Sequence, residues 1–149
     1  MKKRVISVLL VVMFTASIFA FAGCSTSGGS ADADVVKLGF IGPMTGDAAI
    51  YGSSAEEGAQ LAVAEINAAG GIDGKNIELV AYDSKADQTE AINAYNRLRD
   101  QDGVVAVIGG TLSGETLAMK DIMVQDNMPV LSPTATAVEV TQDAPNVFR

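Results

Sequence analysis

Hydroxyl groups and glycines gather in three short segments of low charge, each placed directly after an apolar run. The segments are 42–46, 109–114 and 132–136. The candidate binding residues are Tyr51, which follows the first segment, Ser113 in the second, and Thr134 and Thr136 in the third. Backbone N–H groups and hydroxyls at the start of a helix favour an anion such as a carboxylate, and Ser113 is expected at such an N-cap. Hydroxyl residues are also common in caps and turns, and a tyrosine often only packs. Taken alone, these residues leave ligand binding and plain cap or turn chemistry open.

Several kinds of catalysis are excluded by residues that the sequence lacks. It contains no histidine and one cysteine, which excludes Ser-His-Asp and Cys-His catalysis and most transition-metal sites. The segment 109–114 has the glycine spacing of a phosphate loop, but Glu115 follows it where lysine is required. We therefore expect no catalytic residue, no metal and no cofactor. The carboxylates that could be paired are interpreted as solvated caps and turns: Asp83, Asp87, Asp100 and Asp102.

Alternating strand-like and helix-like patterns must position these segments. The expected strands are 35–41, 76–82, 104–108, 130–131 and 146–149, and the expected helices are 54–69, 87–100 and 113–126. The run 104–108 is continuously apolar, which predicts a strand buried on both faces. This order predicts an α/β fold with an open, mostly parallel sheet and helices on both faces. In such sheets ligands bind beyond the carboxyl ends of the strands, where the three segments lie.

The first residues have the pattern of an export signal. A basic start, an uncharged apolar run to Phe21 and small residues before Cys24 predict a signal peptide over residues 1–23. The stretch Phe21-Ala22-Gly23-Cys24 resembles the lipobox of bacterial lipoproteins, which implies that Cys24 is acylated and anchors the protein to a membrane. Small polar residues over 24–34 predict a flexible tether. The mature protein is thus expected outside the cytoplasm, on the periplasmic or extracellular side.

The mature chain is strongly acidic. The signal peptide holds three of the ten basic residues, so seven remain against 18 acidic ones, and the net charge becomes about −11. Such a surface repels nucleic acid and anionic lipid headgroups, so neither is expected as a partner.

The body of the chain resembles the branched-chain amino-acid-binding proteins of ABC transporters. The resemblance runs in order through residues 35–149, and the stretches that carry it are 37–46 with Tyr51-Gly52, 57–62, 65–72, 78–83, 103–109, 129–133 and 145–149. It implies a lobe of the type I periplasmic-binding-protein fold, an amino-acid ligand and an ABC permease as partner. The family has a second lobe that closes on the ligand, so residues 35–149 are expected to form a truncated amino-terminal lobe that binds weakly alone.

The same resemblance implies a role for each candidate residue. Ser113 matches the position that holds the α-carboxylate, and Thr136 matches the threonine at the backbone end of the ligand. Thr134 matches a position whose carbonyl accepts from the α-ammonium, and Tyr51 matches an aromatic wall of the side-chain pocket. Two alternatives stay open: the same fold binding amides, urea or aromatic acids, and a small lipid-tethered flavodoxin-like enzyme.

Overall fold

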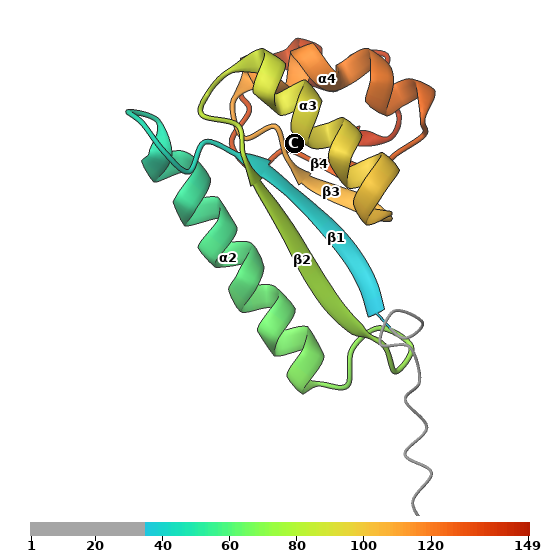
Figure 1. Ribbon diagram of the computed structural model, residues 1–149. Helices are drawn as coiled ribbons and strands as arrows, with labels where there is room; N and C mark the ends of the chain where they lie inside the picture. The colour runs from blue at the N-terminus through green and yellow to red at the C-terminus, as the bar shows by residue number, and fades with distance from the viewer. Residues whose placement is uncertain (1–34) are drawn as a thin grey trace, which may run out of the picture. The chain divides into compact units, whose positions relative to one another are not determined.

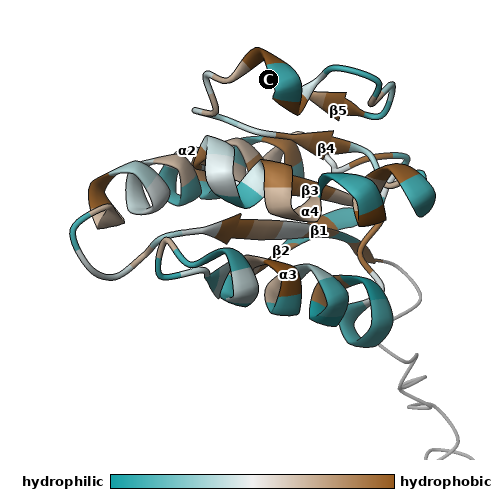
Figure 2. Ribbon diagram, turned by 90° about the horizontal axis from the view of Figure 1, so that it is seen from above, coloured by the Kyte–Doolittle hydropathy of each residue, from teal (hydrophilic) through white to brown (hydrophobic). Residues whose placement is uncertain are grey.

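A computed structural model describes residues 35–149, which form one five-stranded sheet with helices on both faces. The strands are β1 (Val35–Gly42), β2 (Asn76–Asp83), β3 (Ala106–Gly109), β4 (Val130–Leu131) and β5 (Val147–Phe148). All neighbours pair in parallel in the order β2-β1-β3-β4-β5, an order that can be followed in Figure 2. The predicted open parallel α/β sheet is confirmed.

The helices are α2 (Ala49–Ala68), α3 (Gln88–Arg97) and α4 (Ser113–Gln125). A π-helical turn η1 (Leu98–Asp102) follows α3, and a 3-10 turn η2 (Val138–Val140) lies between β4 and β5. Helix α2 lies along one side of β1 and β2, and α3 and α4 pack together on the other side (Figure 1). The reversal of strand order at β1 requires this, because right-handed crossovers that run in opposite directions place their helices on opposite faces.

The core lies between the sheet and the pair α3 and α4. Tyr95 and Leu98 are fully buried in it, as the helical spacing predicts, and Met119 and Met123 of α4 meet them. Helix α3 begins as predicted, with the Asp87 carboxylate accepting a hydrogen bond from Glu90 N at 2.9 Å. The backbone N–H of Asp87 donates to Ser84 O, so Glu90 does not complete a reciprocal capping box.

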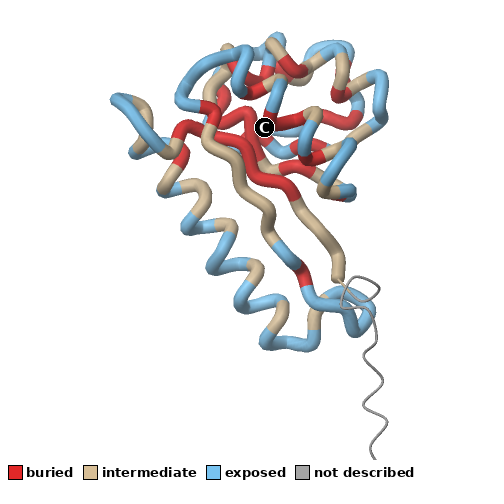
Figure 3. The backbone as a smooth tube through the Cα atoms, in the orientation of Figure 1, coloured by how far each residue is buried: buried red, intermediate tan, exposed pale blue. Residues whose placement is uncertain are grey.

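Helix α2 differs from its prediction in both its start and its burial. It begins at Ala49, five residues before the expected Ser54, and its N-cap Ala48 offers no side-chain hydrogen bond, so no capping residue marks the boundary. Only Gly52 is buried in it, and apolar residues such as Ala62 and Ile66 are exposed. Figure 3 shows that most of this helix is exposed or half-buried. Helix α2 is therefore only partly shielded from solvent by the sheet.

Strand β3 is not buried on both faces, so that prediction was wrong. Its Val107 is buried toward α3 and α4 together with Val130 and Val147 of the next strands. The alternate residues point to the other face, where Leu131 and Phe148 are 50% and 55% exposed. Helix α2 contacts β1 and β2 on that face, and no described helix lies over β4 and β5 there.

Candidate functional site: the loops at the carboxyl edge of the sheet

Three loops leave the carboxyl ends of adjacent strands. The register pairs Ile41 of β1 with Gly109 of β3, and Ile108 of β3 with Leu131 of β4, so the strands end at one edge. The loops that follow are 43–48, 110–112 and 132–137. A parallel sheet brings together segments that are far apart in sequence, and here it gathers the predicted hydroxyl-rich segments.

Ser113 joins two of these loops through its side chain. Its Oγ accepts hydrogen bonds from the backbone N–H groups of Thr136 at 3.1 Å and Ala137 at 3.2 Å. The N-cap of α4 is Leu112, and Ser113 is the first residue of the helix, so the prediction that Ser113 is the N-cap was wrong. With two N–H groups directed at its lone pairs, the hydroxyl keeps its own hydrogen for donation to another acceptor.

Thr134 and Thr136 both lie in the loop after β4, and they form different hydrogen bonds. Thr134 Oγ1 donates to Thr111 O at 2.5 Å, so this hydroxyl ties the loop after β4 to the loop after β3. Thr136 is exposed and contacts Ser113 through its backbone N–H, while its carbonyl accepts from Arg149 at 3.3 Å. The structure thus brings Ser113, Thr134 and Thr136 together.

Tyr51 is not joined to that group. It lies in the first turn of α2, and its side chain is 55% exposed. Within residues 35–149, no hydrogen bond links its hydroxyl to the other three candidates. Its position on the loop side of α2 is held by Gly52, which is buried against Pro43.

Beneath the loops lies a buried polar network that the sequence did not reveal. Gly110 O accepts hydrogen bonds from Thr116 Oγ1 at 2.5 Å and from Ser132 Oγ at 2.6 Å, and Thr111 Oγ1 donates to Ile41 O at 3.1 Å. The bonds of Ser132 and Thr111 cross between strand ends or loops, and the bond of Thr116 ties α4 to the loop before it, so the network fixes their relative positions. Hydroxyl residues also occur commonly in turns and on exposed helix faces, which is why no sequence signal separated these from solvent-facing ones.

The carboxylate of Glu115 is also buried in this region. Its Oε1 accepts from Ser84 Oγ at 2.5 Å, and its Oε2 accepts from Leu112 N at 3.1 Å. These two bonds tie the residue after β2 to the start of α4. The sequence showed Glu115 only as a departure from a phosphate loop, and its burial was not expected.

Asp83 is partly exposed, as interpreted, and its carboxylate also fixes the loop after β1, which the sequence did not indicate. Its carboxylate accepts from Met44 N at 2.8 Å, Thr45 Oγ1 at 2.5 Å and Lys85 N at 2.8 Å. Desolvation by burial raises the pKa of Asp83, but the hydrogen bonds from Thr45, Met44 and Lys85 together outweigh it and hold the pKa below its usual value. Asp83 is therefore a clamp on the segment that leads to Tyr51.

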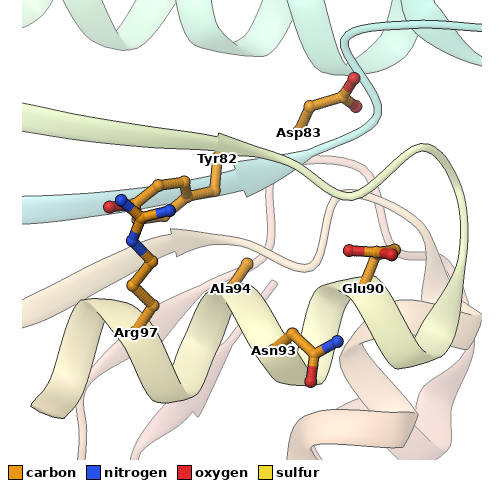
Figure 4. A pocket seen from close by; sticks show the side chains of 6 residues that line it. All are labelled: Tyr82, Asp83, Glu90, Asn93, Ala94 and Arg97. Atoms are coloured by element: carbon orange, nitrogen blue, oxygen red, sulfur yellow. The ribbon is translucent and has the colours of Figure 1, made fainter. Parts of the chain in front are cut away.

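A surface pocket of about 250 Å³ lies elsewhere, between the end of β2 and α3 (Figure 4). One wall is the Tyr82 ring, with the Arg97 guanidinium 4.5 Å from its centroid. The Tyr82 hydroxyl donates to Asp102 at 2.9 Å, and burial together with this carboxylate raises the pKa of Tyr82. None of the predicted site residues lines this pocket, whose lining residues are Tyr82, Asp83, Glu90, Asn93, Ala94 and Arg97.

Residues 35–149 contain neither a metal-binding cluster nor a membrane-spanning helix. No group of three or more Asp, Glu, His or Cys side chains there is arranged to hold a metal ion. No helix in this part of the chain combines the length and the apolar character needed to cross a membrane. The predicted signal peptide, Cys24 and the tether lie outside the described residues.

The described residues form an open parallel α/β sheet whose loops converge at the carboxyl edge, the place where ligands bind in folds of this kind. Residues 35–149 match the family model described as periplasmic binding protein, and the chain belongs to this family. The family description implies an extracytoplasmic, periplasmic location. The resemblance found in the sequence is thereby confirmed.

The relatives agree with this assignment. The "Leucine-, isoleucine-, valine-, threonine-, and alanine-binding protein" of Pseudomonas aeruginosa is 38% identical over 109 residues, which are 73% of this chain and 29% of that protein. The "Leu/Ile/Val-binding protein" of Escherichia coli K12 has the same identity and the same shares. The crystal structure of the branched-chain amino acid transporter substrate binding protein LivJ of Streptococcus pneumoniae, in complex with isoleucine, is 42% identical with a TM-score of 0.73, covering 76% of this chain and 33% of that one.

The chain thus spans about a third of the length of these relatives. They are named as binding proteins and not as enzymes, which agrees with the expectation of no catalytic step.

Proposed function

We propose that this chain is the amino-terminal lobe of a lipid-anchored, extracytoplasmic protein that binds a branched-chain or other aliphatic amino acid for an ABC importer. The observation that carries the proposal is the Ser113 hydroxyl, which accepts two N–H groups from the loop after β4 at the start of α4. That geometry leaves one hydroxyl hydrogen, and helical N–H groups beside it, to meet the α-carboxylate of a ligand.

The other candidates take the roles that the resemblance implies. Thr136 contacts the backbone end of the ligand, the carbonyl of Thr134 accepts from the α-ammonium, and Tyr51 forms one wall of the side-chain pocket. The names of the relatives support an aliphatic amino acid, since they list leucine, isoleucine and valine. The protein performs no reaction: it binds the amino acid, presents it to a permease and releases it.

Calorimetry on the mature polypeptide, expressed from Cys24 to its natural end, tests the ligand. A panel of leucine, isoleucine, valine, alanine and threonine should give heat with at least one. Ser113→Ala should weaken that binding by about tenfold or more, the effect of losing one hydrogen bond to a charged group. The matched control is Thr89→Ala, which removes an exposed hydroxyl from α3 and should leave the affinity unchanged.

Two outcomes would contradict the proposal. Absence of heat with every amino acid overturns the ligand assignment, and heat with amides, urea or aromatic acids alone replaces it with the second ligand class. An equal affinity of Ser113→Ala and the parent protein would remove Ser113 from the site.

The anchor is tested separately. Expressed in bacteria with its own first 23 residues, the protein should partition into a detergent phase and carry diacylglyceryl mass on Cys24. Cys24→Ser should abolish both properties and leave amino-acid binding intact, because every ligand contact proposed above lies within residues 35–149. A protein that stays in the aqueous phase with Cys24 present would refute the anchor.

A further inference from the structure

The side chain of Glu115 is a buried acidic group in the same helical turn as Ser113. Glu115 is 1% exposed and lies two residues after Ser113 in the same helix. Its Oε2 takes the N–H of Leu112, the residue immediately before Ser113, at 3.1 Å. The carboxylate and the site therefore share the first turn of α4.

Nothing in the described part of the chain neutralises this carboxylate with a full positive charge. Its two partners, the Ser84 hydroxyl and the Leu112 N–H, are neutral groups. Arg99 forms ion pairs with Asp100 and with Asp126, and Asp126 lies at the other end of α4 from Glu115. The start of α4 contributes roughly half a positive charge, which is smaller than the full charge of one carboxylate.

The electrostatic potential at the start of α4 is consequently less favourable to an anion than the sequence suggested. A helix N-terminus with free N–H groups attracts any anion, whereas this one has one N–H occupied and a buried negative charge beside it. A ligand that carries only a carboxylate is repelled. A ligand that also carries an ammonium group gains attraction that offsets the repulsion, because its net charge is zero.

We infer that Glu115 is a specificity-determining residue that selects zwitterionic α-amino acids over simple monocarboxylates. The inference rests on the proposed function, since it assumes a ligand carboxylate at Ser113. It deepens that function by separating two ligand classes that the fold alone accommodates: amino acids, and aliphatic or aromatic acids without an amine. Glu115 acts through its charge and need not touch the ligand.

The test compares three ligands of the same shape and different charge. They are L-leucine (zwitterion), 4-methylpentanoate (anion) and L-leucinamide (cation), each titrated into the mature protein and into Glu115→Gln. Glutamine keeps the shape and can keep both hydrogen bonds, donating to Ser84 Oγ and accepting from Leu112 N. The variant removes a unit charge at a separation from the ligand on the order of 8 Å. The affinity for 4-methylpentanoate should then rise about fivefold, the affinity for leucinamide should fall about fivefold, and the affinity for leucine should change less than about twofold.

A second variant adds the opposite charge without touching the buried carboxylate. Gln88 is exposed, and its amide nitrogen lies 3.2 Å from the position of a Cβ added at Gly114, so its side chain reaches the start of α4. Gln88→Lys should therefore reproduce the same ranking and remains informative even where Glu115→Gln fails to fold. Ser84→Ala is the matched control, because it removes one hydrogen bond from Glu115 and leaves the charge in place.

The outcomes separate this inference from the function on which it rests. Changes ordered by ligand charge in both variants support the inference. If Glu115→Gln and Ser84→Ala shift all three ligands by a common factor, Glu115 only positions the loop and the inference falls, while the proposed function stands. If the parent protein binds 4-methylpentanoate more tightly than leucine, the inference also falls. If the parent protein binds none of the three, the proposed function fails first and takes the inference with it.

Discussion

Gly52 and Gly58 on helix α2 allow one chemical change to be made in two different surroundings. A Cβ added at Gly52 would lie 1.9 Å from Pro43 O and 2.6 Å from Pro43 C. A Cβ added at Gly58 would meet nothing within 4 Å. Both glycines are helical, so Gly→Ala changes the entropy of the unfolded chain by the same amount at both positions. The difference between the two variants therefore reports on the folded state.

The size of that difference follows from the contact. In an open helical position, alanine is more stable than glycine by about 1 kcal/mol, so Gly58→Ala should raise the free energy of unfolding by about that amount. Relief of the 1.9 Å contact at Gly52 requires backbone movement of more than about 1 Å in the buried segment at Pro43, and such overpacking costs about 1–3 kcal/mol. Because the gain from replacing glycine in a helix is common to both positions, Gly52→Ala should be about 1–3 kcal/mol less stable than Gly58→Ala.

Urea unfolding followed by circular dichroism measures both free energies on the mature protein. The same displacement would move Tyr51 and the loop after β1, so Gly52→Ala should also weaken leucine binding while Gly58→Ala should not. Equal stability of the two variants would refute the close approach of α2 to Pro43. A loss of binding in Gly58→Ala would refute the separation of that helix face from the site.

Three further predictions concern single hydrogen-bonding groups. Asp83→Asn should lower the free energy of unfolding at pH 7 and make it depend less on acid. A carboxyl whose pKa is depressed in the folded state stabilises the protein above about pH 4, and that contribution is lost as the pH falls through the folded pKa. The free energies of urea unfolding at pH 7 and pH 3 should therefore differ less in the variant than in the parent protein. Asn67→Asp should cost about 1–2 kcal/mol in the same assay, because Asn67 both donates to Ile77 O at 2.9 Å and accepts from Ile77 N at 2.7 Å, and aspartate cannot donate. Tyr95→Phe should cost about 1 kcal/mol by thermal unfolding, since the buried Tyr95 gives its hydroxyl hydrogen to Asp126 at 3.0 Å; an unchanged midpoint would count against that bond.

The parts of the fold that depend on local pattern were predictable from the sequence. The cap at Asp87 and the buried spacing of Tyr95 and Leu98 are set by residues within two or three turns, and the structure matches them. The start of α2 was missed because Ala48 carries no capping side chain, so propensity alone gave no boundary. The burial of β3 was overestimated because an apolar run shows only that both faces of a strand can be buried. It does not show whether a helix covers each face.

The site divides in the same way. The edge of the sheet and the hydroxyl-rich loops follow from strand order, which the sequence contains as alternating elements. The partners of each hydroxyl do not, because Ser113 receives its N–H groups from a loop that is 23 residues away in the chain. The roles of Glu115 and Asp83 were missed for a related reason, because an acidic residue in a first helical turn or after a strand is ordinary. Only the folded structure shows that Glu115 is buried and that Asp83 accepts hydrogen bonds from the loop after β1.

The hydroxyls of the site act mainly on the backbone of its own loops, and this bears on how a ligand would be held. The donors Thr111, Thr116, Ser132 and Thr134 all direct their hydrogens at main-chain carbonyls of neighbouring strand ends or loops. These bonds fix the loops before any ligand arrives, so the groups left to meet it are N–H dipoles, the hydrogen of Ser113, the carbonyl of Thr134 and the exposed Thr136, none of which carries a full charge. Fixed neutral dipoles distinguish shape and hydrogen-bonding pattern well and net charge poorly. Discrimination by charge must then come from a full charge nearby, and the shielded carboxylate closest along the helix to Ser113 is that of Glu115.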